Sequence, residues 1–143
     1  MRSILVFITI FISAISIAQI EITGTLTGTY YSQGGAYKEP DLTPFSLGKL
    51  NFYLIRVDSL TQKTTPYKIQ SDSLGKFKIS LPSGIYHASS GKDLILEYSN
   101  KVVMGYQHNT SWTINSYGAF LINEKTKSIN VTRHESHICY MCP

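Results

Sequence analysis

The fold is decided by the stretch DSLGKFKISLPSGIY, which spans residues 72–86. Phe77, Ile79 and Leu81 alternate with polar residues, which is the period of a β-strand with one face toward solvent. A turn precedes this strand, because an Asp side chain bonds its own backbone and Gly75 tolerates a positive φ. Pro82 ends the strand by removing a hydrogen-bond donor. This stretch therefore predicts a turn, a half-buried strand and a second reversal at Gly84.

The rest of the chain repeats this organisation in short segments separated by Gly, Pro, Asn and Ser. Leu50, Phe52 and Leu54 share one face of a predicted strand over 49–57, and Tyr53 and Ile55 share the other, which is typical of a central strand. Further strands are predicted at 20–26, 93–98, 101–107, 111–115, 118–123 and 127–133, with a hairpin tip at 123–126. This spacing predicts an all-β, antiparallel β-sandwich.

One long stretch, Thr27 to Leu47, interrupts the strand pattern and reads as an irregular loop. It carries Tyr30, Tyr31 and Tyr37. A loop of about 20 residues inside a compact domain is either functional or poorly ordered. Tyrosine combines a large apolar face with a polar group, so these three residues are candidates for a binding loop for sugars or peptides.

Two segments resemble the carboxypeptidase regulatory-like domain, a transthyretin-like (prealbumin-like) β-sandwich found in secreted bacterial proteins. Residues 22–26 resemble its opening strand around Gly24, and residues 72–86 resemble its D-x-x-G-x-F-x-I-x-x-P-x-G-x-Y signature. Small secreted proteins of Bacteroidota-type bacteria often have this form. The resemblance implies folding positions and an auxiliary role rather than a catalytic site. Those positions are Gly24, Asp72, Gly75, Phe77, Ile79, Pro82, Gly84 and Tyr86.

The first eighteen residues have the pattern of a cleavable signal peptide, which forms a helix during export. Arg2 precedes an apolar run, and Ser16-Ile17-Ala18 places small residues before an expected cut at Gln19. Cleavage leaves no segment that could span a membrane as a helix. We therefore expect an exported protein in the periplasm, at the cell surface or in the medium. It divides into the leader (1–18), a β-sandwich (19–133) and a C-terminal tail (134–143).

The tail contains two histidines and the chain's two cysteines, in the order His134, His137, Cys139 and Cys142. Export places the thiols in an oxidising space, which favours a disulfide between Cys139 and Cys142 if the tail curls enough to bring them together. The alternative is a metal site in which all four residues bind Zn or Cu. The spacing leaves both interpretations open.

Several functions lack their sequence patterns. No Gly-x-Ser-x-Gly is present for a hydrolase, no histidine has a Glu at the third following position, and the lysines are scattered rather than clustered. We therefore expect no enzyme, no cofactor and no nucleic-acid partner. The leading hypothesis is a non-catalytic accessory module at the cell envelope that binds a carbohydrate, a peptide or another envelope protein. The alternative is a metal-handling protein that uses the tail.

Overall fold

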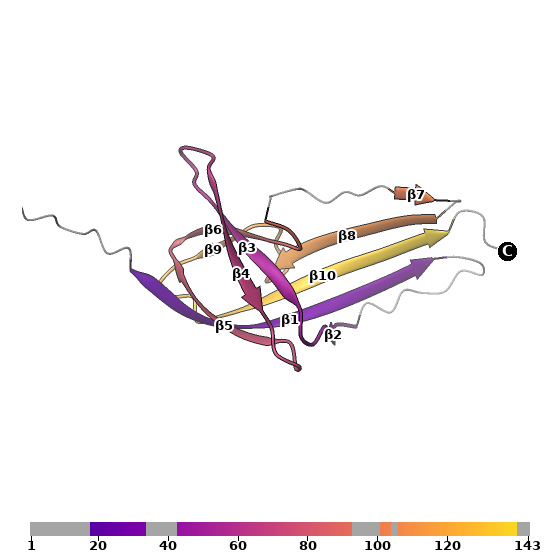
Figure 1. The fold of residues 1–143 in the computed structure, drawn as a ribbon, viewed down its shortest axis with the longest axis horizontal. Helices are drawn as coiled ribbons and strands as arrows, with labels where there is room; N and C mark the ends of the chain where they lie inside the picture. The colour runs from indigo at the N-terminus through magenta and orange to yellow at the C-terminus, as the bar shows by residue number, and fades with distance from the viewer. Residues whose placement is uncertain (1–17, 34–42, 93–100, 104–105, 140–143) are drawn as a thin grey trace, which may run out of the picture.

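The computed structural model describes residues 18–33, 43–92, 101–103 and 106–139. Within these ranges the chain is all-β, without a helix, and its strands form two sheets (Figure 1). The expected all-β fold with two packed sheets is confirmed. The signal peptide and Tyr37 lie outside the described residues, as do the predicted strand at 93–98 and Cys142.

The first sheet has six strands in the described part of the chain. An antiparallel sheet was expected, but its central pair of strands is parallel. Its path runs β2 (Phe45–Ser46), β1 (Gln19–Gln33), β10 (Ser128–Cys139), β8 (Tyr106–Ile114) and β7 (Lys101–Val103). In addition, β5 (Lys76–Pro82) pairs with the first half of β1. The parallel pair is β1 with β10, in register from Thr23 opposite Ser128 to Gln33 opposite Ile138.

The second sheet is antiparallel, in the order β4 (Thr64–Gln70), β3 (Asn51–Val57), β6 (Gly84–Ser89) and β9 (Phe120–Ile122). The predicted tip at 123–126 is a turn, in which the Thr126 amide donates to the Asn123 carbonyl at 2.8 Å. It does not join a hairpin, because β9 belongs to the second sheet and β10 to the first. The turn instead carries the chain from one sheet to the other, and it delivers β10 in the same direction as β1.

One other expectation was wrong, and one strand was not predicted. The stretch from Thr27 to Leu47 begins as strand, because β1 continues to Gln33, and β2 lies near its end. β4 was not predicted, because Pro66 occupies its middle. Pro66 is tolerated there because β4 is the edge strand of the second sheet, and proline in sheets is confined to such edges.

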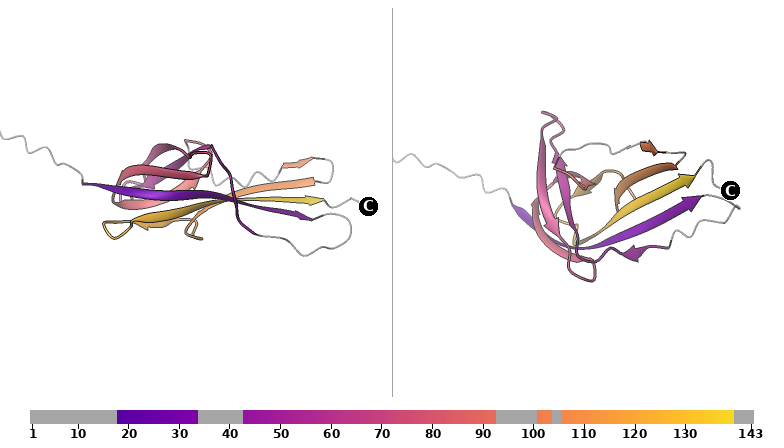
Figure 2. Two further views of the ribbon diagram at one scale, coloured as in Figure 1. Left: turned by 90° about the horizontal axis from the view of Figure 1, so that it is seen from below. Right: turned by 45° about the vertical axis from the view of Figure 1, so that its right-hand side comes forward.

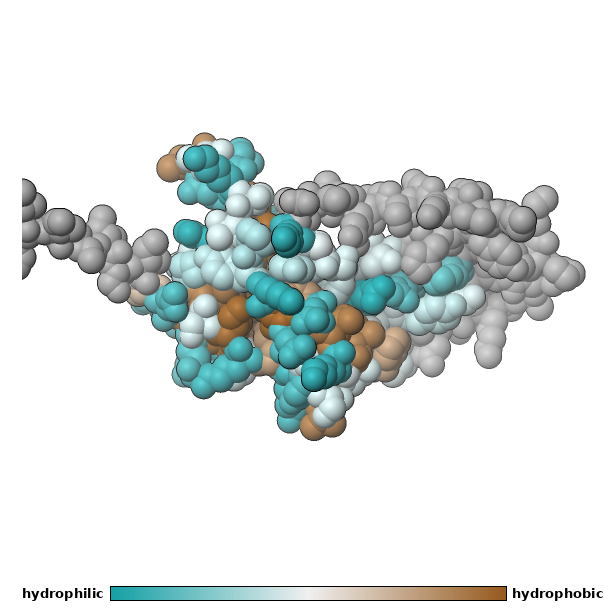
Figure 3. All heavy atoms as spheres, viewed as in Figure 1, coloured by the Kyte–Doolittle hydropathy of each residue, from teal (hydrophilic) through white to brown (hydrophobic). Residues whose placement is uncertain are grey.

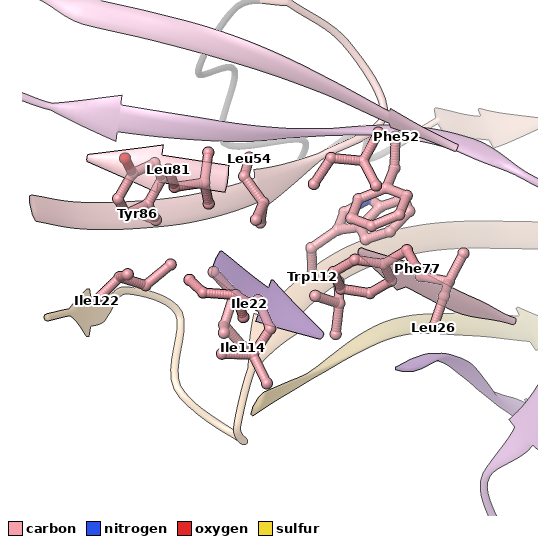
Figure 4. Packing of buried hydrophobic residues seen from close by; sticks show 13 residues of the cluster. Ile22, Leu26, Phe52, Leu54, Phe77, Leu81, Tyr86, Trp112, Ile114 and Ile122 are labelled. Carbon is pink, nitrogen blue, oxygen red and sulfur yellow. The ribbon is translucent and has the colours of Figure 1, made fainter. Parts of the chain in front are cut away.

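The core lies between the two sheets (Figure 4), and the signature residues reach it from both of them, through β5 of the first sheet and β6 of the second. Figure 3 shows apolar atoms in the middle of this packed half, surrounded by hydrophilic ones. Phe77 is buried against Gly24, where an added Cβ would lie 2.2 Å from the ring. Gly75 has a φ of 78°, in the turn where the Asp72 carboxylate accepts from the Leu74 and Lys76 amides, both at 2.8 Å.

Tyr86 closes the signature stretch from inside the core. Its hydroxyl donates to the Pro82 carbonyl at 2.7 Å, and burial raises the pKa of this phenol above its usual value. Ile79 packs at the edge of the same cluster. Phe77, Ile79 and Tyr86 therefore pack in the core, and Asp72 and Gly75 form the turn before β5. Central position is also confirmed for β3, in which Phe52, Leu54 and Ile55 are fully buried.

Candidate functional site

Three strands of the first sheet run past the second sheet. Figures 1 and 2 show β1, β8 and β10 continuing together beyond β3, β4, β6 and β9. Side chains alternate between the two faces of a strand, so the face that covers the core continues outward at every second position. We call this continuation the overhang face; the described strands of the second sheet cover it at Trp112 but do not extend along it beyond that row. Its residues are Tyr30 of β1, Thr110 and Trp112 of β8, and Arg133, Glu135 and His137 of β10.

Trp112 marks the boundary between the core and the overhang face. Its ring stacks on Phe52 of the second sheet, with ring centroids 6.1 Å apart and an interplanar angle of 16°. Only 9% of Trp112 is exposed. Its indole Nε1 is buried and has no hydrogen-bond partner among the described residues. A buried donor without an acceptor is uncommon in native proteins and calls for an explanation.

Arg133 lies directly opposite Trp112 in the register of β10 and β8. Its guanidinium carbon is 5.9 Å from the centre of the indole ring, and its Nη2 donates to the Glu135 carboxylate two positions along the strand. The Nε of Arg133 is buried and, like the indole nitrogen, has no partner in the described part of the chain. The row where the second sheet ends therefore holds two buried donors without acceptors.

Tyr30 and His137 form the outer part of the overhang face. Their ring centroids are 5.3 Å apart with an interplanar angle of 42°. Tyr30 is 46% exposed, so much of its ring is open to solvent. Beside it, the side chains of Arg133 and Glu135 are 30% and 28% exposed. An exposed aromatic ring thus lies next to a charge pair that solvent can reach.

The opposite face of the same strands is a ladder of hydroxyl, amide and imidazole groups. Thr27 and Thr132 are hydrogen-bonded at 3.0 Å. His134 lies between two threonines, with Nδ1 2.7 Å from the Thr29 hydroxyl and Nε2 3.0 Å from the Thr113 hydroxyl. Burial lowers the pKa of His134 below its usual value. This face is hydrogen-bonded within itself.

The structure separates the predicted metal ligands. His134 and His137 are three positions apart on one strand, so they lie on opposite faces of the sheet. Both ring nitrogens of His134 are already hydrogen-bonded, and a metal ion would need one of them. Cys139 ends β10, and the disulfide expected between it and Cys142 falls outside the described residues. The described residues contain no group of three or more metal-binding side chains.

The predicted binding tyrosines also separate. Tyr30 lies on the overhang face, whereas Tyr31 is its neighbour on the same strand and therefore belongs to the other face. Arg133 and Glu135 were not predicted. The sequence did contain a signal, because Arg133, Glu135 and His137 alternate with His134 and Ser136, but the strand was expected to end at Arg133. Residues 134–139, assigned to a tail, instead continue β10.

No family model matches the chain, and no curated protein matches its sequence. The likeness to the carboxypeptidase regulatory-like domain therefore stays a prediction. Within the described ranges, no helix is long and apolar enough to cross a membrane.

Proposed function

We propose that the protein is an exported, non-catalytic binding module whose partner contacts the overhang face. The observation that carries this proposal is the pair of buried donors, Trp112 Nε1 and Arg133 Nε, without acceptors in the described chain. Buried polar groups are nearly always hydrogen-bonded, and an unpaired one costs about 1–3 kcal/mol. Two such groups at the inner end of an uncovered face are explained if a ligand supplies the acceptors.

The arrangement of charges supports binding rather than catalysis. Glu135 already accepts a hydrogen bond from Arg133. A carboxylate held in this way orients a ligand, whereas a general base must be free to take a proton from the substrate. Export, to the periplasm, the cell surface or the medium, is supported by the leader pattern of residues 1–18. The signature at 72–86 supports a transthyretin-like type of sandwich.

Photo-crosslinking tests this proposal by comparing neighbouring positions on the two faces. A photoreactive phenylalanine analogue replaces Tyr30 in one variant and Tyr31 in a matched control, and each is irradiated with the envelope fraction of the source organism. We expect one discrete product from position 30 and none from position 31. Products from position 31 alone, or from neither position, would contradict the assigned face. Turnover of a peptide or glycoside by the purified mature protein would contradict the non-catalytic role.

The metal-handling alternative needs a smaller ligand set than the sequence suggested. His137 and Cys139 are two positions apart on β10, whereas both ring nitrogens of His134 are hydrogen-bonded to threonine hydroxyls. Deleting 134–143 would destroy half of β10, so substitutions make the better test. Metal analysis of a variant with His137→Ala, Cys139→Ser and Cys142→Ser against His134→Gln distinguishes the sites. Stoichiometric Zn or Cu that only the first variant loses would favour metal handling.

A further inference from the structure

We propose that the ligand of the overhang face is a neutral carbohydrate chain, bound through adjacent hydroxyl groups. This inference rests on the proposed function and names the ligand class for the same face. It is argued from the charge balance of Arg133 and Glu135 and from the exposed ring of Tyr30, and Trp112 serves as its reporter.

The charge balance favours a neutral ligand. Arg133 and Glu135 form an ion pair, so together they offer hydrogen-bond donors and acceptors while their charges cancel. A charged ligand gains from one partner and is repelled by the other. A hydroxyl group is both a donor and an acceptor, and two hydroxyls on adjacent carbons can accept from Arg133 while donating to Glu135. Hydrogen bonds to charged groups are the stronger kind, so this pairing gives orientation as well as affinity.

The aromatic part of the overhang face fits the apolar side of a sugar ring. A pyranose has an apolar face of C–H groups, which packs on an aromatic ring. Tyr30 offers such a ring at 46% exposure, and His137 lies 5.3 Å from it at a tilt of 42°. A sugar on Tyr30 would therefore lie beside the ion pair, because Tyr30 is directly opposite Glu135 in the register of β1 and β10.

The buried donors supply the reporter for this inference. Trp112 is the only tryptophan of the chain. The Arg133 guanidinium lies over its indole ring at 5.9 Å. A ligand hydroxyl that accepts a hydrogen bond from Arg133 draws the guanidinium toward itself. The position of the guanidinium over the indole ring then changes. Ligand binding should therefore change the fluorescence of Trp112 directly.

The experiment titrates the mature protein with defined probes and follows Trp112 emission, with calorimetry as a second measure of affinity. The neutral probes are the hexasaccharides of β-1,4-glucose, β-1,4-xylose and β-1,4-mannose. The other probes are polygalacturonate, as an acidic polymer, and an unstructured peptide of mixed composition. We expect saturable binding of at least one neutral hexasaccharide.

Two variants and two matched controls locate the site. Tyr30→Ala removes the stacking ring and Glu135→Gln removes the charged acceptor, and each should weaken hexasaccharide binding about tenfold or more. Tyr31→Ala removes the same side chain from the opposite face. Glu21→Gln removes a carboxylate whose exposed ion pair with Lys78, at 2.8 Å, lies elsewhere on the first sheet. Both controls should stay within about twofold of the parent protein.

The outcomes separate this inference from the proposed function. Binding of the peptide or the acidic polymer alone, with the same loss in Tyr30→Ala, overturns the carbohydrate class and leaves the binding face in place. Equal weakening by variants and controls, or no change in emission with any neutral hexasaccharide, also overturns it. Failure of crosslinking from position 30 overturns the proposed function itself. Circular dichroism of each variant establishes that it is folded. If Tyr30→Ala does not fold, Glu135→Gln alone tests the site.

Discussion

Along β1 the inward positions of the covered half are Ile22, Gly24 and Leu26, whereas those of the uncovered half are Tyr30 and Ser32. β10 changes in the same way, from Ile129 and Val131 to a row of charged and imidazole groups. The strands are continuous and the face is the same. What changes is the presence of the second sheet. Apolar side chains stabilise a fold only where another element removes them from water, and the second sheet does so only in the covered half.

This difference indicates that the residues of the covered half stabilise the fold, whereas those of the uncovered half are free to serve another purpose. The covered half has buried side chains in close contact, such as Phe77 on Gly24 and Phe52 on Trp112. The uncovered half keeps an ion pair, an exposed ring and the unpaired Nε of Arg133, which add little to stability. Residues that do not stabilise a fold and yet lie together on one face suit recognition, which is why the overhang face is the proposed site.

The largest expected effect contrasts two inward positions of β1. Leu26→Ala should lower the free energy of unfolding by about 2–5 kcal/mol, because Leu26 is fully buried and its loss leaves a cavity. Tyr30→Ala, four residues later on the same face, should lower it by less than about 1 kcal/mol, because nearly half of Tyr30 is already exposed. Urea unfolding of both variants measures the contrast. Similar losses would mean that the two halves form one core.

The second effect concerns the closest contact of the covered half. Gly24→Ala places a methyl group 2.2 Å from the Phe77 ring, and such overpacking costs about 1–3 kcal/mol. Phe77→Leu shortens the partner and should return part of that loss in the double variant. A double-mutant cycle from thermal unfolding gives the coupling between the two sites. Additive losses would show that the backbone of β1 yields instead of the ring.

The third effect tests whether the uncovered half contributes little to stability. Replacing both members of the ion pair, with Arg133→Met and Glu135→Gln, should change the free energy of unfolding by less than about 1 kcal/mol. Partly exposed ion pairs contribute little, and removing both partners leaves no buried charge unpaired. Chemical denaturation supplies the measurement. A loss above about 2 kcal/mol would show that the pair is structural, and the contrast between the halves would weaken.

The sequence revealed those parts of the fold that local patterns determine. Residues 72–86 have a turn former, an alternating run and a proline stop in order, and each has the predicted role. The second half of β1 was missed because Gly28, Tyr30 and Ser32 give no apolar alternation. β4 was missed because Pro66 argues against a strand unless its edge position is known. Edge position and parallel pairing depend on distant segments, which no local pattern encodes.

The candidate site was only partly predictable for the same reason. Tyr30 was singled out for its chemistry, although it was assigned to a loop. Trp112 packs in the core, and its unpaired nitrogen is visible only in the structure. Arg133 and Glu135 gain meaning from their register opposite Trp112 and Tyr30. The two tail histidines looked like a cluster in sequence and are separated by the alternation of a strand.

The smallest expected effect belongs to the opposite face and depends on pH. Burial lowers the pKa of His134 below the usual value of 6.5, so the unfolded chain binds a proton more readily than the folded one at that position. Stability from this group is therefore complete above about pH 6.5 and is lost as the pH falls toward the lowered pKa of the folded state. His134→Gln keeps a polar side chain between Thr29 and Thr113 and removes the titration. Urea unfolding at pH 7.5 and 5.5 should show a larger loss in the parent protein than in this variant. Since the other three histidines are common to both proteins, the difference isolates His134, and an equal loss in both would show that its threonine partners hold the charged form as well as the neutral one.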